Sequence, residues 1–116
     1  MSDFVFQAVS NKRIAILTTG TERRQFIHIN DVCSALHTAL DAHLQGVYDI
    51  TSFEWVSILE MARVIADETG AEIIRGNVVG STPITPIRER VPGWLPRVDL
   101  CEGIRRMIHE IQSKLS

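Results

Sequence analysis

Residues 20–32 carry side chains that could bind a negatively charged ligand. Arg23 and Arg24 form a doubled cation just before a short apolar stretch. A guanidinium held at a strand edge can clamp a phosphate with two parallel hydrogen bonds. From the spacing alone, a solvated surface arginine is the more common outcome. His28 follows in the same stretch, where it could contact a ligand or make a structural hydrogen bond.

A turn, a short strand and a helix are expected to position these side chains. Strand side chains alternate, so Phe26, His28 and Asn30 are predicted to share one face. Asp31 is predicted to cap the following helix, because its carboxylate can accept hydrogen bonds from the N–H groups of the first turn. This role is favoured over that of a catalytic acid. The helix is expected over residues 31–44.

The remaining pattern predicts an α/β fold with about four helices and a small sheet of short strands. Helical spacing, capping boxes and stop glycines indicate helices at residues 3–10, 31–44 and 57–69, and from residue 99 onward. Short apolar runs indicate strands at residues 14–17, 46–50 and 72–75. An irregular loop is expected over residues 76–92, where periodicity disappears and glycines and prolines recur. Trp94 is expected to be a packing anchor before the last helix.

Composition and charge limit the class of protein. One domain is expected to include all 116 residues, and a net charge of −2 gives no electrostatic footprint for nucleic acid or anionic membrane. No apolar run reaches transmembrane length and the N-terminus lacks a signal-peptide pattern, so we expect a cytoplasmic protein. Cys33 and Cys101 are expected to be buried free thiols, and no spacing suits a metal site.

Several motifs recur in the order and spacing of a known family. The chain resembles the C-terminal, substrate-binding part of the extended short-chain dehydrogenase/reductases, the NAD-dependent nucleotide-sugar epimerases and dehydratases. The resemblance lies in residues 20–32, 46–50, 56–60 and 93–96. In that family a segment Gly-x-x-x-Arg-(Asp)-Phe-Ile-x-Val-x-Asp carries an arginine that contacts the ligand's diphosphate. Arg24 matches this arginine, which makes it the leading candidate for binding a nucleotide sugar.

The chain also departs from the family's pattern. Asp49 stands where relatives usually carry asparagine, and an Arg-Pro-Gly-Asp-like element that relatives normally have near the irregular loop is absent. Arg88 or Arg90 could supply the second phosphate-facing cation that this element would provide. With Arg24 and His28, these arginines complete the set of candidate substrate-binding residues.

The enzyme family's catalytic and cofactor motifs are missing. Relatives hold NAD on a Gly-x-x-Gly-x-x-Gly turn and transfer protons with a Tyr-x-x-x-Lys pair. Neither occurs here, and the single tyrosine, Tyr48, is followed four residues later by Ser52. We therefore expect no catalytic residue and no cofactor bound by this chain alone. It corresponds to a substrate-binding lobe without its dinucleotide-binding lobe, either a truncated product or a piece of a longer enzyme.

Two readings of function stay open. The chain is either a nucleotide-sugar-binding lobe, which a dinucleotide-binding domain could complete, or a non-catalytic interaction or regulatory module that kept the fold. Apolar surfaces that the missing lobe covers in relatives would be exposed here. We therefore expect a homo-oligomer under either reading.

Overall fold

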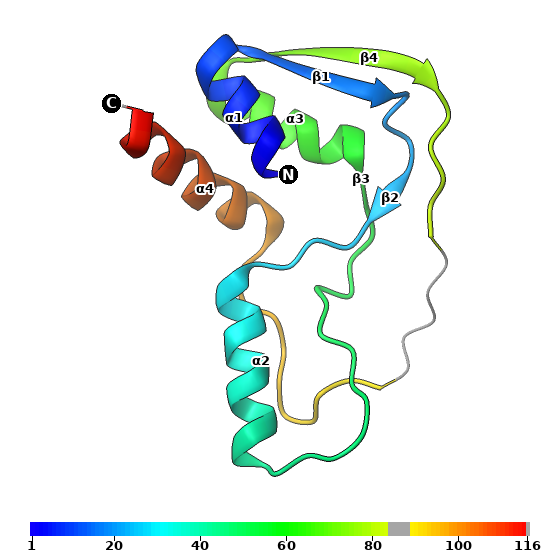
Figure 1. Ribbon diagram of the computed structural model, residues 1–116, viewed down its shortest axis with the longest axis vertical. Helices are drawn as coiled ribbons and strands as arrows, with labels where there is room; N and C mark the ends of the chain where they lie inside the picture. The colour runs from blue at the N-terminus through cyan, green and yellow to red at the C-terminus, as the bar shows by residue number, and fades with distance from the viewer. Residues whose placement is uncertain (84–88, 116) are drawn as a thin grey trace.

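The computed structural model describes residues 1–83 and 89–115, which form four helices and two small sheets (Figure 1). The helices are α1 (Ser2–Asn11), α2 (Ile29–Asp41), α3 (Ile58–Thr69) and α4 (Leu100–Leu115). The strands are β1 (Arg13–Thr18), β2 (Arg23–Arg24), β3 (Val56–Ser57) and β4 (Glu72–Val78). β1 pairs with β4 in parallel and β2 pairs with β3 antiparallel. The predicted mixture of helices and short strands is confirmed.

The main hydrophobic core lies between the β1–β4 sheet and three helices. Figure 1 shows α1 and α3 beside this sheet and α4 packed on these two helices, whereas α2 extends away from the sheet. Strand β1 buries every second residue, Ile14 and Ile16, because strand side chains alternate. The helices contribute residues at helical spacing. The buried ones are Val5, Ala8, Met61, Ala62, Ile65, Ile104 and Ile108.

A second, smaller core holds α2 to the chain that precedes α4. Ala35, Val91 and Trp94 are its buried members, and the Trp94 side chain is only 6% exposed. Phe53 meets the Trp94 ring edge-on, with ring centroids 6.2 Å apart. Trp94 is thus the packing anchor that the sequence indicates.

The predicted caps of the last two helices are confirmed. Ser57 accepts a hydrogen bond from the Glu60 N–H at 3.0 Å, and Gly70 ends α3 in the left-handed conformation with φ of 76°. Asp99 likewise accepts from the Glu102 N–H at 2.8 Å. These local sequence signals therefore fix where α3 and α4 begin.

The prediction for the start of α2 is wrong. Its N-cap is His28, whose Nδ1 accepts a hydrogen bond from the Asn30 N–H at 3.0 Å. The helix consequently begins at Ile29, and Asp31 lies inside the first turn with its carboxylate engaged elsewhere. No regular strand covers Phe26 to His28, because β2 ends at Arg24.

The strand predicted over residues 46–50 is not formed. The only β-type contact there is an isolated bridge between Asp49 and Arg90, with the Asp49 N–H donating to the Glu89 carbonyl. An apolar run becomes a strand only where a neighbouring strand can accept its hydrogen bonds. β4, in contrast, continues three residues beyond the predicted end, because β1 pairs with it as far as Val78.

The prediction of buried cysteines is also wrong. Cys33 and Cys101 are free thiols, but both are exposed. On α2 the buried positions are Asp31 and Ala35, and on α4 they are Ile104 and Ile108, so each cysteine lies on the outer side of its helix. Their place in an amphipathic pattern was insufficient to identify the buried face.

Candidate functional site

Arg24 is held in place by two main-chain carbonyls. Its Nη1 donates hydrogen bonds to the carbonyl of Arg23 at 2.8 Å and to that of Ser81 at 3.0 Å. A guanidinium has five N–H donors, and these two contacts use only Nη1. The Nε and Nη2 edge is the pair of donors that can bind a carboxylate or phosphate side by side. The Ser81 contact therefore ties the Arg24 side chain to the loop that follows β4.

The turn before Arg24 is fixed against the start of α3. The carbonyl of Gly20 accepts from the Leu59 N–H, and that of Glu22 accepts from the Ile58 N–H, both at 2.9 Å. A Cβ on Gly20 would lie 3.0 Å from the Leu59 side chain, so the close approach needs a glycine there. The arginine strand thus has a rigid support.

Glu22 is a buried carboxylate that the sequence analysis missed. It is 7% exposed, one oxygen accepts from the Thr18 hydroxyl, and the other has no hydrogen-bond partner among the described residues. A side chain on Gly80 would run into this oxygen. The carboxylate therefore lies beneath the same post-β4 loop that holds Arg24.

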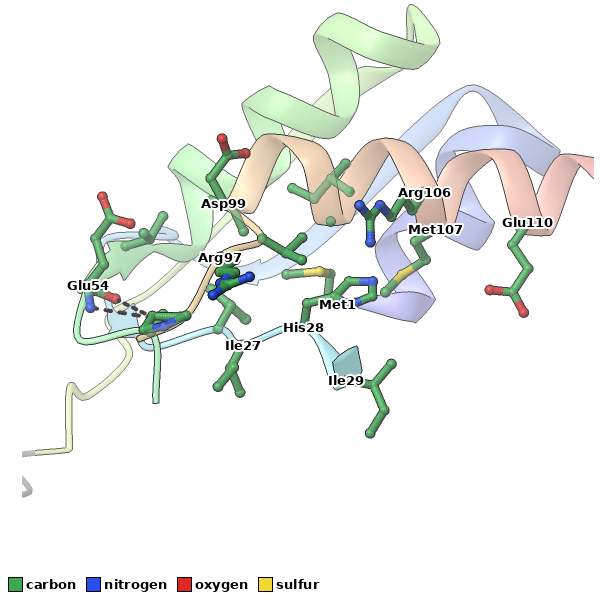
Figure 2. Close-up of a pocket in the computed structure, with 18 residues that line it drawn as sticks. Met1, Ile27, His28, Ile29, Glu54, Arg97, Asp99, Arg106, Met107 and Glu110 are labelled. Atoms are coloured by element: carbon green, nitrogen blue, oxygen red, sulfur yellow. Dashed lines mark hydrogen bonds between the residues drawn. The ribbon is translucent and has the colours of Figure 1, made fainter. Parts of the chain in front are cut away.

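His28 lines a cavity of about 480 Å³ between the start of α2, helix α4 and the segment that leads into α4 (Figure 2). Because Nδ1 accepts the cap hydrogen bond, the neutral ring carries its proton on Nε2 and is a donor there. Apolar side chains provide most of the cavity wall, including Met1, Phe26 and Met107. The cavity suits a ligand or partner surface that is mainly apolar with a few polar groups.

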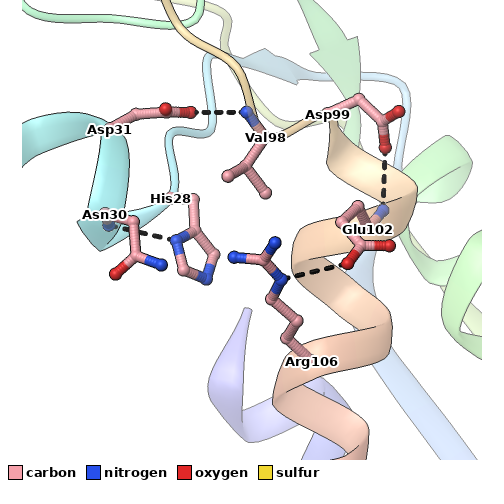
Figure 3. A network of polar contacts seen from close by, with 7 residues as sticks. All are labelled: His28, Asn30, Asp31, Val98, Asp99, Glu102 and Arg106. Atoms are coloured by element: carbon pink, nitrogen blue, oxygen red, sulfur yellow. Dashed lines mark hydrogen bonds and ion pairs between the residues drawn. The ribbon is translucent and has the colours of Figure 1, made fainter. Parts of the chain in front are cut away.

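Charged side chains of both signs lie around this cavity. Arg97 and Arg106 bring guanidinium groups, whereas Glu54, Asp99 and Glu110 bring carboxylates. Arg106 is paired with Glu102 on its own helix, Nε to Oε1 at 3.0 Å (Figure 3). Arg97 makes no ion pair among the described residues, and its main chain has a specific anchor.

That anchor is Asp31, which is 3% exposed. Its two carboxylate oxygens accept hydrogen bonds from the N–H groups of Arg97 and Val98, each at 2.9 Å. Figure 3 shows the Asp31 side chain directed from α2 toward Val98 in the irregular segment before α4. One turn further along α2, Ser34 accepts from Trp94 Nε1 at 2.8 Å. Asp31 therefore positions the cavity wall, a role that no local sequence signal indicates.

The three predicted binding residues that the structure describes, Arg24, His28 and Arg90, do not gather in one place. Only His28 lines the cavity; Arg24 and Arg90 lie outside it. The Arg90 guanidinium carbon lies 4.2 Å from the centre of the Phe53 ring, which makes Arg90 part of the second core's edge. Arg88 lies outside the described residues.

Other kinds of site have little support in the part of the chain that the structure describes. Across residues 1–83 and 89–115 no three His, Cys, Asp or Glu side chains gather as metal ligands, and no helix is both long and apolar enough to cross a membrane. On the α3–α4 surface, the hydrogen bond and charge of Glu68 raise the pKa of Arg105. The fixed guanidinium of Arg24 could bind an anion, and the cavity could bind a mainly apolar group.

Comparison with known proteins identifies similar chains. Residues 1–51 match the model of the NAD dependent epimerase/dehydratase family. UDP-glucuronic acid decarboxylase 6 of Arabidopsis thaliana is 27% identical over 99% of this chain and 36% of its own length. The dTDP-D-glucose 4,6-dehydratase of Bos taurus is 31% identical over 90% of this chain and 34% of its own.

A solved structure extends the similarity to the fold. MoeE5, in complex with UDP-glucuronic acid and NAD, superposes with a TM-score of 0.73 at 25% identity, over 99% of this chain and 42% of its own. The chain spans about a third of the length of the curated relatives that it matches. The similarity thus concerns one part of larger proteins.

Proposed function

We propose that this chain, which is related to the NAD-dependent nucleotide-sugar epimerases and dehydratases, is a nucleotide-sugar-binding lobe that acts together with a dinucleotide-binding lobe. The observation that carries the proposal is the orientation of Arg24. Its Nη1 is tied to two carbonyls, which leaves Nε and Nη2 as a paired set of donors. Such a guanidinium is preorganised to bind a diphosphate with little loss of side-chain freedom.

His28 and the cavity extend this binding surface beyond the diphosphate. Residues 24 and 28 are separated by four residues, so their main-chain atoms lie at most about 14 Å apart. An elongated nucleotide sugar could therefore place its diphosphate at Arg24 and a sugar hydroxyl or carboxylate near His28 Nε2 or Arg97. MoeE5 binds UDP-glucuronic acid, a ligand that carries both a diphosphate and a carboxylate.

The chain supplies binding groups rather than hydride chemistry. It has neither the glycine-rich NAD turn nor a Tyr-x-x-x-Lys pair. The apolar part of the cavity, with Ile29 at its edge 65% exposed, provides a surface on which a dinucleotide-binding lobe can pack. NAD, the proton-transfer residues and the reaction itself would come from that second lobe.

A titration tests the binding proposal. NMR spectra of the labelled chain would be recorded with NAD and, separately, with UDP-, dTDP-, GDP- and CDP-sugars, UDP-glucuronic acid among them. We expect saturable shifts around Arg24 with one sugar nucleotide and none with NAD. Arg24→Ala should weaken that binding about tenfold or more, and Arg24→Lys should restore only part of it, because an ammonium cannot bind bidentately.

The matched control is Arg23→Ala. Arg23 is the neighbouring exposed cation. Its removal changes the net charge by the same amount as Arg24→Ala but leaves the Arg24 guanidinium in place. Equal losses in the Arg23 and Arg24 variants would indicate general charge attraction and contradict the proposal. A folded chain that responds to no sugar nucleotide, alone or with a dinucleotide-binding lobe added, would also contradict it.

One observation favours a second candidate function, a non-catalytic interaction module. Several large apolar side chains are exposed, among them Leu17 at 87%, Val79 at 77% and Leu40 at 73%. Leu17 and Val79 adjoin the Thr18–Val78 pair where β1 and β4 end, and exposed apolar residues that cluster in this way are typical of surfaces that pack against another protein. Self-association together with silence across the ligand panel would support this module over the binding lobe.

A further inference from the structure

Strand β4 has a free edge that can pair with another strand. In the described residues the sheet contains only β1 and β4, so each strand has one unpaired side. The Glu72 N–H donates to the Lys12 carbonyl, on the β1 side. Main-chain groups alternate along a strand, and Ile73 and Arg75 therefore direct their N–H and C=O groups away from β1. These groups are available on the outer edge.

The free edge lacks several features that usually block strand pairing. β4 is seven residues long, contains no proline and carries two adjacent isoleucines, Ile73 and Ile74. Its one cation, Arg75, donates from Nε to the Thr19 carbonyl at 2.8 Å, which ties the guanidinium toward the end of β1. The Arg75 charge, which could otherwise discourage another strand from pairing here, is thus held toward Thr19.

We propose that two copies of this chain pair through antiparallel β4 strands, with the two-fold axis at Ile74. The β1–β4 sheets of the two copies would then join as one four-stranded sheet. In this register Ile73 lies opposite the partner's Arg75, and the two such pairs exchange four main-chain hydrogen bonds. Ile74 lies opposite the partner's Ile74 as a close apolar pair on the outer face.

Charge selects this register over its neighbour. Moving the axis one residue to Arg75 would place the two guanidinium-bearing residues directly opposite each other, which is destabilising. With the axis at Ile74, Glu72 lies opposite the partner's Gly76 and meets no like charge. Glu72 also keeps Arg13 of its own sheet as its register partner. The strand is therefore self-complementary at Ile74.

Disulfide trapping tests the register. The native thiols are exposed, so Cys33→Ser and Cys101→Ser first remove them at little cost in stability. Ile74→Cys is then added and the chain is mildly oxidised. A non-hydrogen-bonded antiparallel pair has a Cα separation of about 4.5 Å, within the range that a disulfide spans. We expect a covalent dimer on a non-reducing gel.

Glu72→Cys in the same background is the matched control. Residue 72 is on the same strand and the same exposed face, but in the proposed register it lies far from its own copy. Efficient cross-linking at residue 74 with little at residue 72 supports the pairing. Equal cross-linking at both positions, or none at residue 74, overturns it.

Sedimentation equilibrium of the chain with native cysteines gives an independent readout. Ile74→Lys places two ammonium groups opposite each other and should weaken self-association about fivefold or more, whereas Glu72→Lys should leave it nearly unchanged. Circular dichroism confirms that both variants fold, which is expected because Ile74 is 40% exposed in one copy. A native chain that stays monomeric at all accessible concentrations contradicts the proposal.

Discussion

The carboxylate of Asp31 accepts a hydrogen bond from the main chain of Val98 at 2.9 Å, across 67 positions of sequence. Its second oxygen does the same for Arg97. A residue inside the first turn of α2 thereby holds the segment that leads into α4. This segment forms one wall of the cavity. The shape of the candidate site therefore depends on the Asp31 side chain, although Asp31 does not itself line the cavity.

Replacing Asp31 should destabilise the chain more than its place on a short helix suggests. Asp31→Ala leaves two main-chain N–H groups without acceptors, and we expect the free energy of unfolding to fall by about 1–3 kcal/mol. Urea denaturation followed by circular dichroism measures this. Asp41→Ala, an exposed carboxylate on the same helix, is the control and should change stability by less than about 0.5 kcal/mol. Similar losses in both variants would contradict the anchoring role.

The role of Asp31 shows where sequence reasoning reached its limit. An aspartate at the start of a helical pattern is normally a cap, and the pattern gave no reason to look 67 residues ahead for its partners. His28 took the cap instead, because its Nδ1 can accept the same main-chain hydrogen bond. Caps at Ser57 and Asp99 were predictable since their partners lie three residues away.

The Trp94–Ser34 hydrogen bond should couple α2 to the same segment. We expect Ser34→Ala and Trp94→Phe each to lower the free energy of unfolding, because the first leaves the indole N–H unpaired and the second also reduces packing. In the double variant the losses should fall short of additive by about 0.5–1.5 kcal/mol. Strict additivity in a denaturation double-mutant cycle would mean that the hydrogen bond contributes nothing.

Gly76 should tolerate no side chain, because strand β1 passes too close. A Cβ there would collide with the main-chain carbonyl of Leu17, which cannot rotate away as a side chain could. Gly76→Ala should therefore cost about 1–3 kcal/mol of stability. Gly93→Ala is the comparison: nothing lies near its Cβ, so only the positive φ of 77° opposes the change, at about 1–2 kcal/mol.

The same contact explains why the sheet was only partly predictable. The strand at residues 72–75 was identified from its apolar run, but its continuation to Val78 depends on a close approach to β1 at Gly76 that composition alone reads as a loop signal. The candidate site was likewise predictable only in part. Arg24 and His28 were identified from a motif, whereas Glu22, Asp31 and the α4 side of the cavity required the tertiary arrangement.

Substitutions of His28 can separate its two roles, helix cap and cavity residue. His28→Ala removes the acceptor for the Asn30 N–H and should cost about 1 kcal/mol of stability, whereas His28→Ser supplies a new cap and should recover most of it. If His28 Nε2 also contacts the ligand, His28→Ser should still bind a sugar nucleotide about fivefold more weakly than the native chain. Calorimetric titration measures the affinity, and the denaturation midpoint measures the stability.

His37→Ser is the control, because His37 is an exposed histidine on the same helix. This variant should change neither the affinity nor the stability appreciably. Native affinity in the His28→Ser variant would assign this residue to the cap alone and would leave Arg24 as the principal binding residue.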